Sequence, residues 1–119
     1  TTEDGITKTY HKVYFTAVMN LGYEGGGFRF CPAADCSDDR LDIITVSDLP
    51  RLKVLCLLPT AFKGWHTRFR GINIDTCTEV TVTSDRALPV HTDGEPVFLQ
   101  KEIHVHLEDQ KLRIITPCK

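Results

Sequence analysis

The sequence predicts a single mainly β domain, a β-sandwich of antiparallel strands with one amphipathic helix. Several short segments are rich in β-branched and aromatic residues and alternate apolar with polar positions, as half-buried strands do. One central segment instead repeats its apolar residues at helical spacing. A length of 119 residues with 41% hydrophobic residues suffices for one domain with a buried core. A two-sheet sandwich is therefore favoured over a closed barrel.

The strands are predicted, in chain order, at residues 10–19, 41–46, 79–84, 101–108 and 111–117. One face of the first strand consists of Val13, Phe15, Ala17 and Met19. The pair Asp109-Gln110 predicts a hairpin between the last two strands, and Asp93-Gly94 predicts a turn between two further β-like segments.

The helix is predicted within residues 47–66 by the helical spacing of Leu52, Leu55 and Cys56. Ser47 or Asp48 can cap its N-terminus. Pro59 is expected to kink or end the helix because it lacks a backbone donor, and Gly64 suits a left-handed stop after it. The helix is expected to pack across the sheet or at one end of it.

Charge and cysteine content exclude several classes of protein. Fourteen Lys and Arg against sixteen Asp and Glu give a net charge of −2, so bulk charge favours neither nucleic-acid nor membrane binding. Five cysteines without a C-x-x-C pair fit neither a secreted disulfide framework nor a common zinc site, which indicates a reducing cytoplasm. The longest apolar run, residues 54–58, is far shorter than the ~20 residues of a membrane span. The polar start TTEDGITKTY is typical of a cut inside a longer protein.

The segment GYEGGGFRFCPAADCSDDRLD, residues 22–42, is the most unusual one. Its glycines Gly25, Gly26 and Gly27 allow a backbone geometry that side chains forbid, either in a plain bulge or loop or where another group packs tightly. No G-x-x-x-x-G-K-[ST] follows, so the segment is not a phosphate-binding P-loop. The aspartates that end it are either solvated turn residues or ligands for a hard cation.

Two surface clusters each allow an ordinary and a functional interpretation. The first is a set of three histidines, His91, His104 and His106. They are either the polar face of a solvent-exposed strand or a metal-binding set. The second is a basic and aromatic cluster of Lys63, Trp65, His66, Arg68 and Arg70. It is either ordinary surface or a contact for phosphate or lipid headgroups.

Three pieces of the chain, in this order, resemble the C-terminal domain of the soluble lipid kinases related to bacterial diacylglycerol kinase, sphingosine kinase and ceramide kinase. They are GGGFRFCPAADCSDDRLDII, the helix ending LLPTAFKGWH, and LPVHTDGEPV followed by KLRIITP. The resemblance covers about residues 20–117 and depends on the order and spacing of the motifs, since each motif is weak alone.

This resemblance implies that residues 1–119 form the β-rich C-terminal domain of a two-domain, ATP-dependent kinase. The N-terminal nucleotide-binding domain of such enzymes carries a G-D-G-[ST] motif, binds most of the ATP and is absent from this chain, where no G-D-G occurs. The expected reaction is phosphorylation of a lipid hydroxyl, with diacylglycerol as the acceptor, by a cytoplasmic protein that meets its lipid at a membrane surface. The fragment alone is expected to be inactive, and assembly as a homo-oligomer is left open.

By the same resemblance, Glu95 of the D-G-E motif is the general base toward the lipid hydroxyl. Phosphoryl transfer depends on positioning and charge stabilisation, so a carboxylate that accepts the hydroxyl proton fits the chemistry. The substrate cleft is expected to include Gly25, Gly26, Gly27, Asp93 and Gly94.

The resemblance also implies a structural Mg²⁺ at Asp38, with the backbone carbonyls of Asp35 and Arg40 and with water as further ligands. Asp39 stands where the family has glycine, so the loop requires Asp39 to tolerate a positive φ if the family geometry is kept. Two alternatives to the lipid kinase stay open. One is a non-catalytic β-sandwich module that binds a lipid or a partner, and the other is a kinase of the related NAD type.

Overall fold

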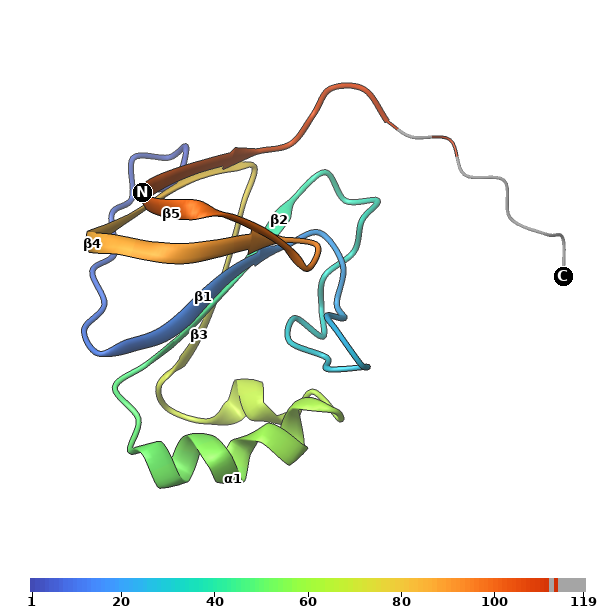
Figure 1. The fold of residues 1–119 in the computed structure, drawn as a ribbon. Helices are drawn as coiled ribbons and strands as arrows, with labels where there is room; N and C mark the ends of the chain where they lie inside the picture. Colours follow the sequence, from blue (N-terminus) through green and yellow to red (C-terminus); the bar gives the residue numbers. More distant parts are fainter. Residues whose placement is uncertain (112, 114–119) are drawn as a thin grey trace, which may run out of the picture.

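The computed structural model describes residues 1–111 and 113. These residues form β1 (Val13–Met19), β2 (Leu41–Ser47), α1 (Arg51–Ala61), the 3-10 helix η1 (Trp65–Arg68), β3 (Ile72–Cys77), β4 (Glu79–Thr92) and β5 (Glu95–His106). Strands β1, β2 and β3 make one antiparallel sheet in that order, and β4 and β5 make a second. The predicted fold class, a mainly antiparallel β domain of two sheets with one helix, is confirmed (Figure 1).

Strand β2 is buried along its whole length because both of its faces are covered. On one face, Ile44 and Val46 pack in a cluster that includes Leu57 of α1. On the other face, Ile43 packs in a second cluster that includes Val80 of β4. The helix, the first sheet and the β4–β5 sheet therefore form three layers, which follow one another from bottom to top of Figure 1.

The start and end of α1 differ from the sequence prediction. Its N-cap is Pro50, without a side-chain cap hydrogen bond, because Ser47 belongs to β2 and Asp48 lies in the turn between them with a positive φ of 54°. Pro59 lies inside the helix, which runs on to Ala61. The left-handed conformation predicted for Gly64 is confirmed by its φ of 72°.

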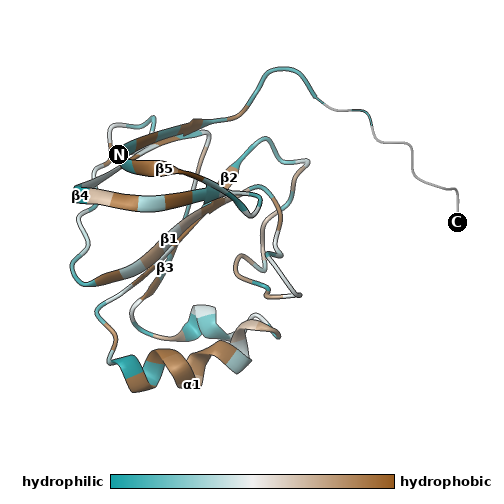
Figure 2. Cartoon of the chain, in the orientation of Figure 1, coloured by the Kyte–Doolittle hydropathy of each residue, from teal (hydrophilic) through white to brown (hydrophobic). Residues whose placement is uncertain are grey.

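The apolar residues whose spacing predicted the helix lie on its outward face. Leu57 and Ala61 are buried, whereas Leu52 is 74% exposed and Leu55 is 64% exposed. Cys56 is exposed as well. The helix is therefore apolar on both faces rather than amphipathic, and brown residues run along most of it in Figure 2.

Four of the five predicted strands lie where strands are observed, and one observed strand was not predicted. This strand is β3, although INIDTC alternates apolar and polar residues over its first four positions. The segments predicted at 79–84 and 101–108 are the paired far ends of one long hairpin, β4–β5. The strand predicted at 111–117 lies almost wholly outside the described residues. Among the described residues, no helix is long and apolar enough to cross a membrane.

Candidate functional site

A broad, open groove follows the N-terminal segment, β1 and the β4–β5 sheet, and nearly half of the chain borders it. Its floor is apolar where the two sheets face each other, with Val18 from β1 and Val82 and Ile103 from the hairpin. The residues predicted from sequence that line it are Gly25, Asp93 and Gly94. Gly25 and the hairpin turn therefore both border this extended groove, whereas Gly26 and Gly27, also predicted to line the cleft, do not.

The turn at Asp93-Gly94 is confirmed as the two-residue connection of the β4–β5 hairpin. Asp93 has a φ of 49° and Gly94 a φ of 85°. Two consecutive positive φ angles are the requirement of a type I′ turn, whose twist matches that of the flanking strands. Thr92 and Glu95 face each other as the last pair of the ladder.

Glu95 is therefore fixed at the start of β5, directly after the turn. It is exposed, and among the described residues its carboxylate has no hydrogen bond and no ion pair. Gly94 next to it lines the groove, whereas Glu95 itself does not. The carboxylate is held by backbone geometry alone and is free to contact another molecule.

The three glycines form a tight loop closed by a bridge between Glu24 and Phe28. The two backbone hydrogen bonds of this bridge are 2.9 and 3.1 Å long. The φ angles of Gly25, Gly26 and Gly27 are 30°, 52° and 94°, which favour glycine at each position. No heavy atom lies within 4 Å of a Cβ built at any of the three. The glycines are needed for their backbone conformation, and no described residue packs tightly against them.

The acidic loop is organised by hydrogen bonds from its own backbone. Oδ1 of Asp35 accepts from the backbone N–H of Ser37 at 2.9 Å and from its hydroxyl at 2.6 Å, and these bonds lower the pKa of Asp35. Oδ1 of Asp38 accepts from the N–H of Arg40 at 2.9 Å. Asp39 adopts a φ of 56°, so it tolerates the positive φ that the resemblance required of it.

Asp42 is a carboxylate near this loop whose position the sequence could not reveal. Its side chain is buried at the start of β2, and Oδ1 accepts a hydrogen bond from the Thr76 hydroxyl at 3.2 Å. Burial raises the pKa of Asp42, and the charge of Asp38 raises it further. A cation held by Asp38 would therefore also reduce the cost of an ionised Asp42.

A metal site made of side chains alone is not found among the described residues. Across residues 1–111 and 113, no three His, Cys, Asp or Glu side chains come together as a metal-ligand group. The predicted Mg²⁺ set consists of one carboxylate and two carbonyls, so it is not a group of that kind. A free second carboxylate oxygen on Asp38 and the neighbouring Asp42 are the features of the loop that fit a cation.

The three histidines do not meet at one place. His104 contacts the carboxylate of Glu79 at 2.6 Å, and His106 lies 3.8 Å from that of Glu108. His91 pairs with Pro96 near the turn, at the opposite end of the hairpin from the other two histidines. The polar strand face explains this set.

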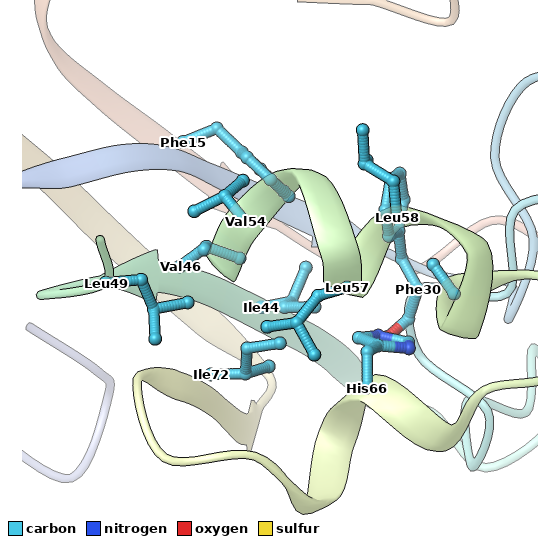
Figure 3. Close-up of a pocket in the computed structure, with 11 residues that line it drawn as sticks. Phe15, Phe30, Ile44, Val46, Leu49, Val54, Leu57, Leu58, His66 and Ile72 are labelled. Atoms are coloured by element: carbon cyan, nitrogen blue, oxygen red, sulfur yellow. The ribbon is translucent and has the colours of Figure 1, made fainter. Parts of the chain in front are cut away.

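His66 does not belong to the surface cluster, because its ring points inward to an apolar pocket of about 30 Å³ (Figure 3). Its Nε2 lies 2.9 Å from the backbone oxygen of Phe30 and donates to it, while the buried Nδ1 has no partner among the described residues. Burial lowers the pKa of His66, so the ring stays neutral. Its role is to join η1 to the segment after the glycine loop.

The chain is similar in sequence to one protein family and to proteins named as kinases. The family model described as the YegS C-terminal NAD kinase beta sandwich-like domain matches residues 2–116. A lipid kinase candidate, YtlR, of Bacillus subtilis (strain 168) is 35% identical over 95 residues, which are 80% of this chain and 30% of YtlR. A protein named diacylglycerol kinase, of Mycobacterium tuberculosis (strain CDC 1551 / Oshkosh), is 36% identical over 88 residues, 64% of this chain and 28% of that kinase. The chain thus spans less than a third of these relatives, and no solved structure matches it.

Proposed function

Because the chain belongs to the YegS C-terminal NAD kinase beta sandwich-like family, the C-terminal domain of diacylglycerol kinase-like lipid kinases, we propose that it is the acceptor half of an ATP-dependent lipid kinase. The proposed reaction transfers the γ-phosphoryl group of ATP to a lipid hydroxyl, with diacylglycerol as the first acceptor to test. The observation that carries the proposal is the match over residues 2–116 together with the kinase names of both relatives. ATP would be bound mainly by an N-terminal nucleotide-binding domain, and the isolated chain would be inactive.

Glu95 is the proposed general base. A carboxylate fixed by the turn, exposed and without a partner can approach an acceptor hydroxyl from the end of the hairpin. Proton removal there assists formation of the new P–O bond, while positioning and charge neutralisation supply most of the catalysis. The apolar floor of the groove and its glycine-lined rim are suited to the acyl chains and glycerol of a lipid.

Mg²⁺ is proposed to bind the acidic loop through Asp38 and the carbonyls of Asp35 and Arg40. When bound, it would supply local positive charge that keeps the loop ordered. The chain's own contribution is the turn that Asp39 permits at its positive φ and the hydrogen bond that orients Asp38.

The relatives' names favour the lipid kinase over both alternatives. A kinase of the NAD type would share the sandwich architecture, and a non-catalytic module would share the apolar groove, but neither is what the relatives are named. The proposed reaction requires the protein to meet its lipid acceptor at a membrane surface, and the proposed location of the protein is the cytoplasm.

The proposed function is tested with the complete protein that contains this chain. Purified protein, labelled ATP and Mg²⁺ are incubated with diacylglycerol, ceramide, sphingosine and NAD in separate reactions. Label in a phospholipid product supports the lipid kinase, whereas label only in NADP would assign the NAD type. No transfer to any acceptor would favour the binding module.

Replacing Asp38 with alanine is expected to remove stabilisation by Mg²⁺. At a Mg²⁺ concentration of about 100 Kd, binding to the folded state alone stabilises by about 2.7 kcal/mol, which the variant would lose. Thermal unfolding of wild type and variant is compared in Mg²⁺ and in chelator, with Asp109→Ala as an exposed aspartate outside the loop. The variant also loses the hydrogen bond from Arg40, and this loss lowers stability equally in Mg²⁺ and in chelator. Equal losses of stability by Asp38→Ala in the two conditions would therefore argue against the ion.

A further inference from the structure

The outward face of α1 is apolar and lies outside both core clusters of the described residues. We define the outer α1 face as Leu52, Leu55 and Trp65, all of which are exposed. Leu52 and Leu55 are three residues apart, so they lie on the same side of the helix. Leu58 and Phe62 border this face but are partly covered, because Leu58 lines the pocket against the sheet and Phe62 stacks on Phe28. The buried residues Leu57 and Ala61 lie on the other side, against the sheet. An apolar helix surface that is not part of the core is a feature of interaction sites.

The charges around this face all have one sign. From Leu49 to Ile74 the sequence contains no Asp or Glu. The same segment contains five cations, Arg51, Lys53, Lys63, Arg68 and Arg70, in a protein of net charge −2. All five are exposed, and none makes an ion pair among the described residues. The occupant of the outer α1 face is therefore expected to be anionic as well as apolar.

Trp65, at the end of this face, combines an exposed apolar ring with a positive charge beside it. It is 56% exposed, and the ammonium of Lys63 lies 4.8 Å from its ring centroid. Tryptophan beside lysine is suited to the boundary of a bilayer, where the ring meets the acyl region and the ammonium meets phosphate. A short apolar helix with flanking cations can lie in the plane of that boundary, and α1, with 11 residues, is too short to span it.

From these observations we infer that α1 and η1 form a docking surface for an anionic phospholipid bilayer. The apolar face would enter the headgroup boundary, and the cations would contact lipid phosphates. This goes beyond the proposed catalytic role, because docking requires neither ATP nor transfer. It would also place the protein on the surface that holds a lipid acceptor.

The test is sedimentation of the complete protein with vesicles, without ATP. Wild type is expected to bind phosphatidylcholine vesicles that contain phosphatidylglycerol, and to bind pure phosphatidylcholine much more weakly. Binding should weaken as salt is raised. Leu55→Ser is expected to weaken binding roughly tenfold through lost apolar burial, and Lys63→Ser about fivefold through one lost charge.

Leu99→Ser is the matched control, because Leu99 is 65% exposed against 64% for Leu55 but lies on β5. It should bind like wild type, and the melting temperature of each variant shows that it is folded. Absence of binding to anionic vesicles, or equal binding by wild type and Leu55→Ser, would overturn the inference. If the protein binds no vesicles, and this face binds a second copy of the chain or another protein, the face would be assigned to a protein partner instead of a bilayer.

Discussion

Replacing Glu95 with glutamine is expected to lower kcat of the complete kinase by roughly 10²- to 10⁴-fold, the usual contribution of a general base. Glutamine has the same size but cannot accept the hydroxyl proton. The side chain is exposed and makes no hydrogen bond among the described residues, so the substitution should leave the fold intact. Initial rates with a lipid acceptor and ATP, with KM for both, measure the effect.

Glu102→Gln is the control for this experiment, because Glu102 is another exposed glutamate on β5, away from the turn. It should leave kcat within the error of wild type. A lower kcat for Glu95→Gln with unchanged KM would indicate an interaction made in the transition state. Equal turnover by Glu95→Gln and wild type would remove Glu95 as the base.

Replacing Gly71 with alanine is expected to be the most destabilising of the substitutions considered, at roughly 2–5 kcal/mol. Gly71 has a φ of 97°, which costs about 1–2 kcal/mol for an L residue with a side chain. An added Cβ would lie 2.7 Å from the side chain of Leu49 and 2.7 Å from the backbone oxygen of Ser47. Overpacking of this kind costs a further ~1–3 kcal/mol.

The location of Gly71 explains why the structure cannot adapt easily. Its carbonyl accepts a hydrogen bond from the N–H of Ser47 at 2.9 Å, where β2 ends and β3 is about to begin, and Leu49 is buried. Gly5→Ala is the matched control, since Gly5 has a φ of 72° but nothing within 4 Å of an added Cβ. Urea unfolding of both variants separates backbone strain from collision. Equal losses would show that the collision is relieved and that strain alone remains.

The sequence predicted best where one residue type is required by local geometry. Positive φ angles at Gly25–Gly27 and Asp93-Gly94 follow from the glycines and from the turn chemistry of Asp-Gly. Strands β1 and β2 follow from their composition. By contrast, β3 has only six residues, and its alternation is too short to distinguish it from a loop; pairing with β2 makes it a strand.

Helix α1 shows why periodicity gives the element but not its orientation. Leu52, Leu55 and Cys56 indicate a helix whichever side they occupy, and a helix apolar on both sides offers no polar face to mark the solvent. Only packing against Ile44 and Val46 showed that the other side, with Leu57, is the buried one. For the same reason, the sequence places His66 among surface residues, whereas its ring is buried and bonds to the backbone oxygen of Phe30.

The sequence by itself determined the fold class, the family resemblance, the hairpin turn before Glu95 and the left-handed Gly64, because these depend on the order of residues and on local backbone sterics. The tertiary structure alone decided that Asp42 is buried beside the acidic loop, that His66 points into the core, and that Leu52 and Leu55 of α1 face outward. Each of these depends on contacts between segments that are distant in the chain. The free energy of burying apolar surface selects such contacts, and a local sequence pattern does not reveal them.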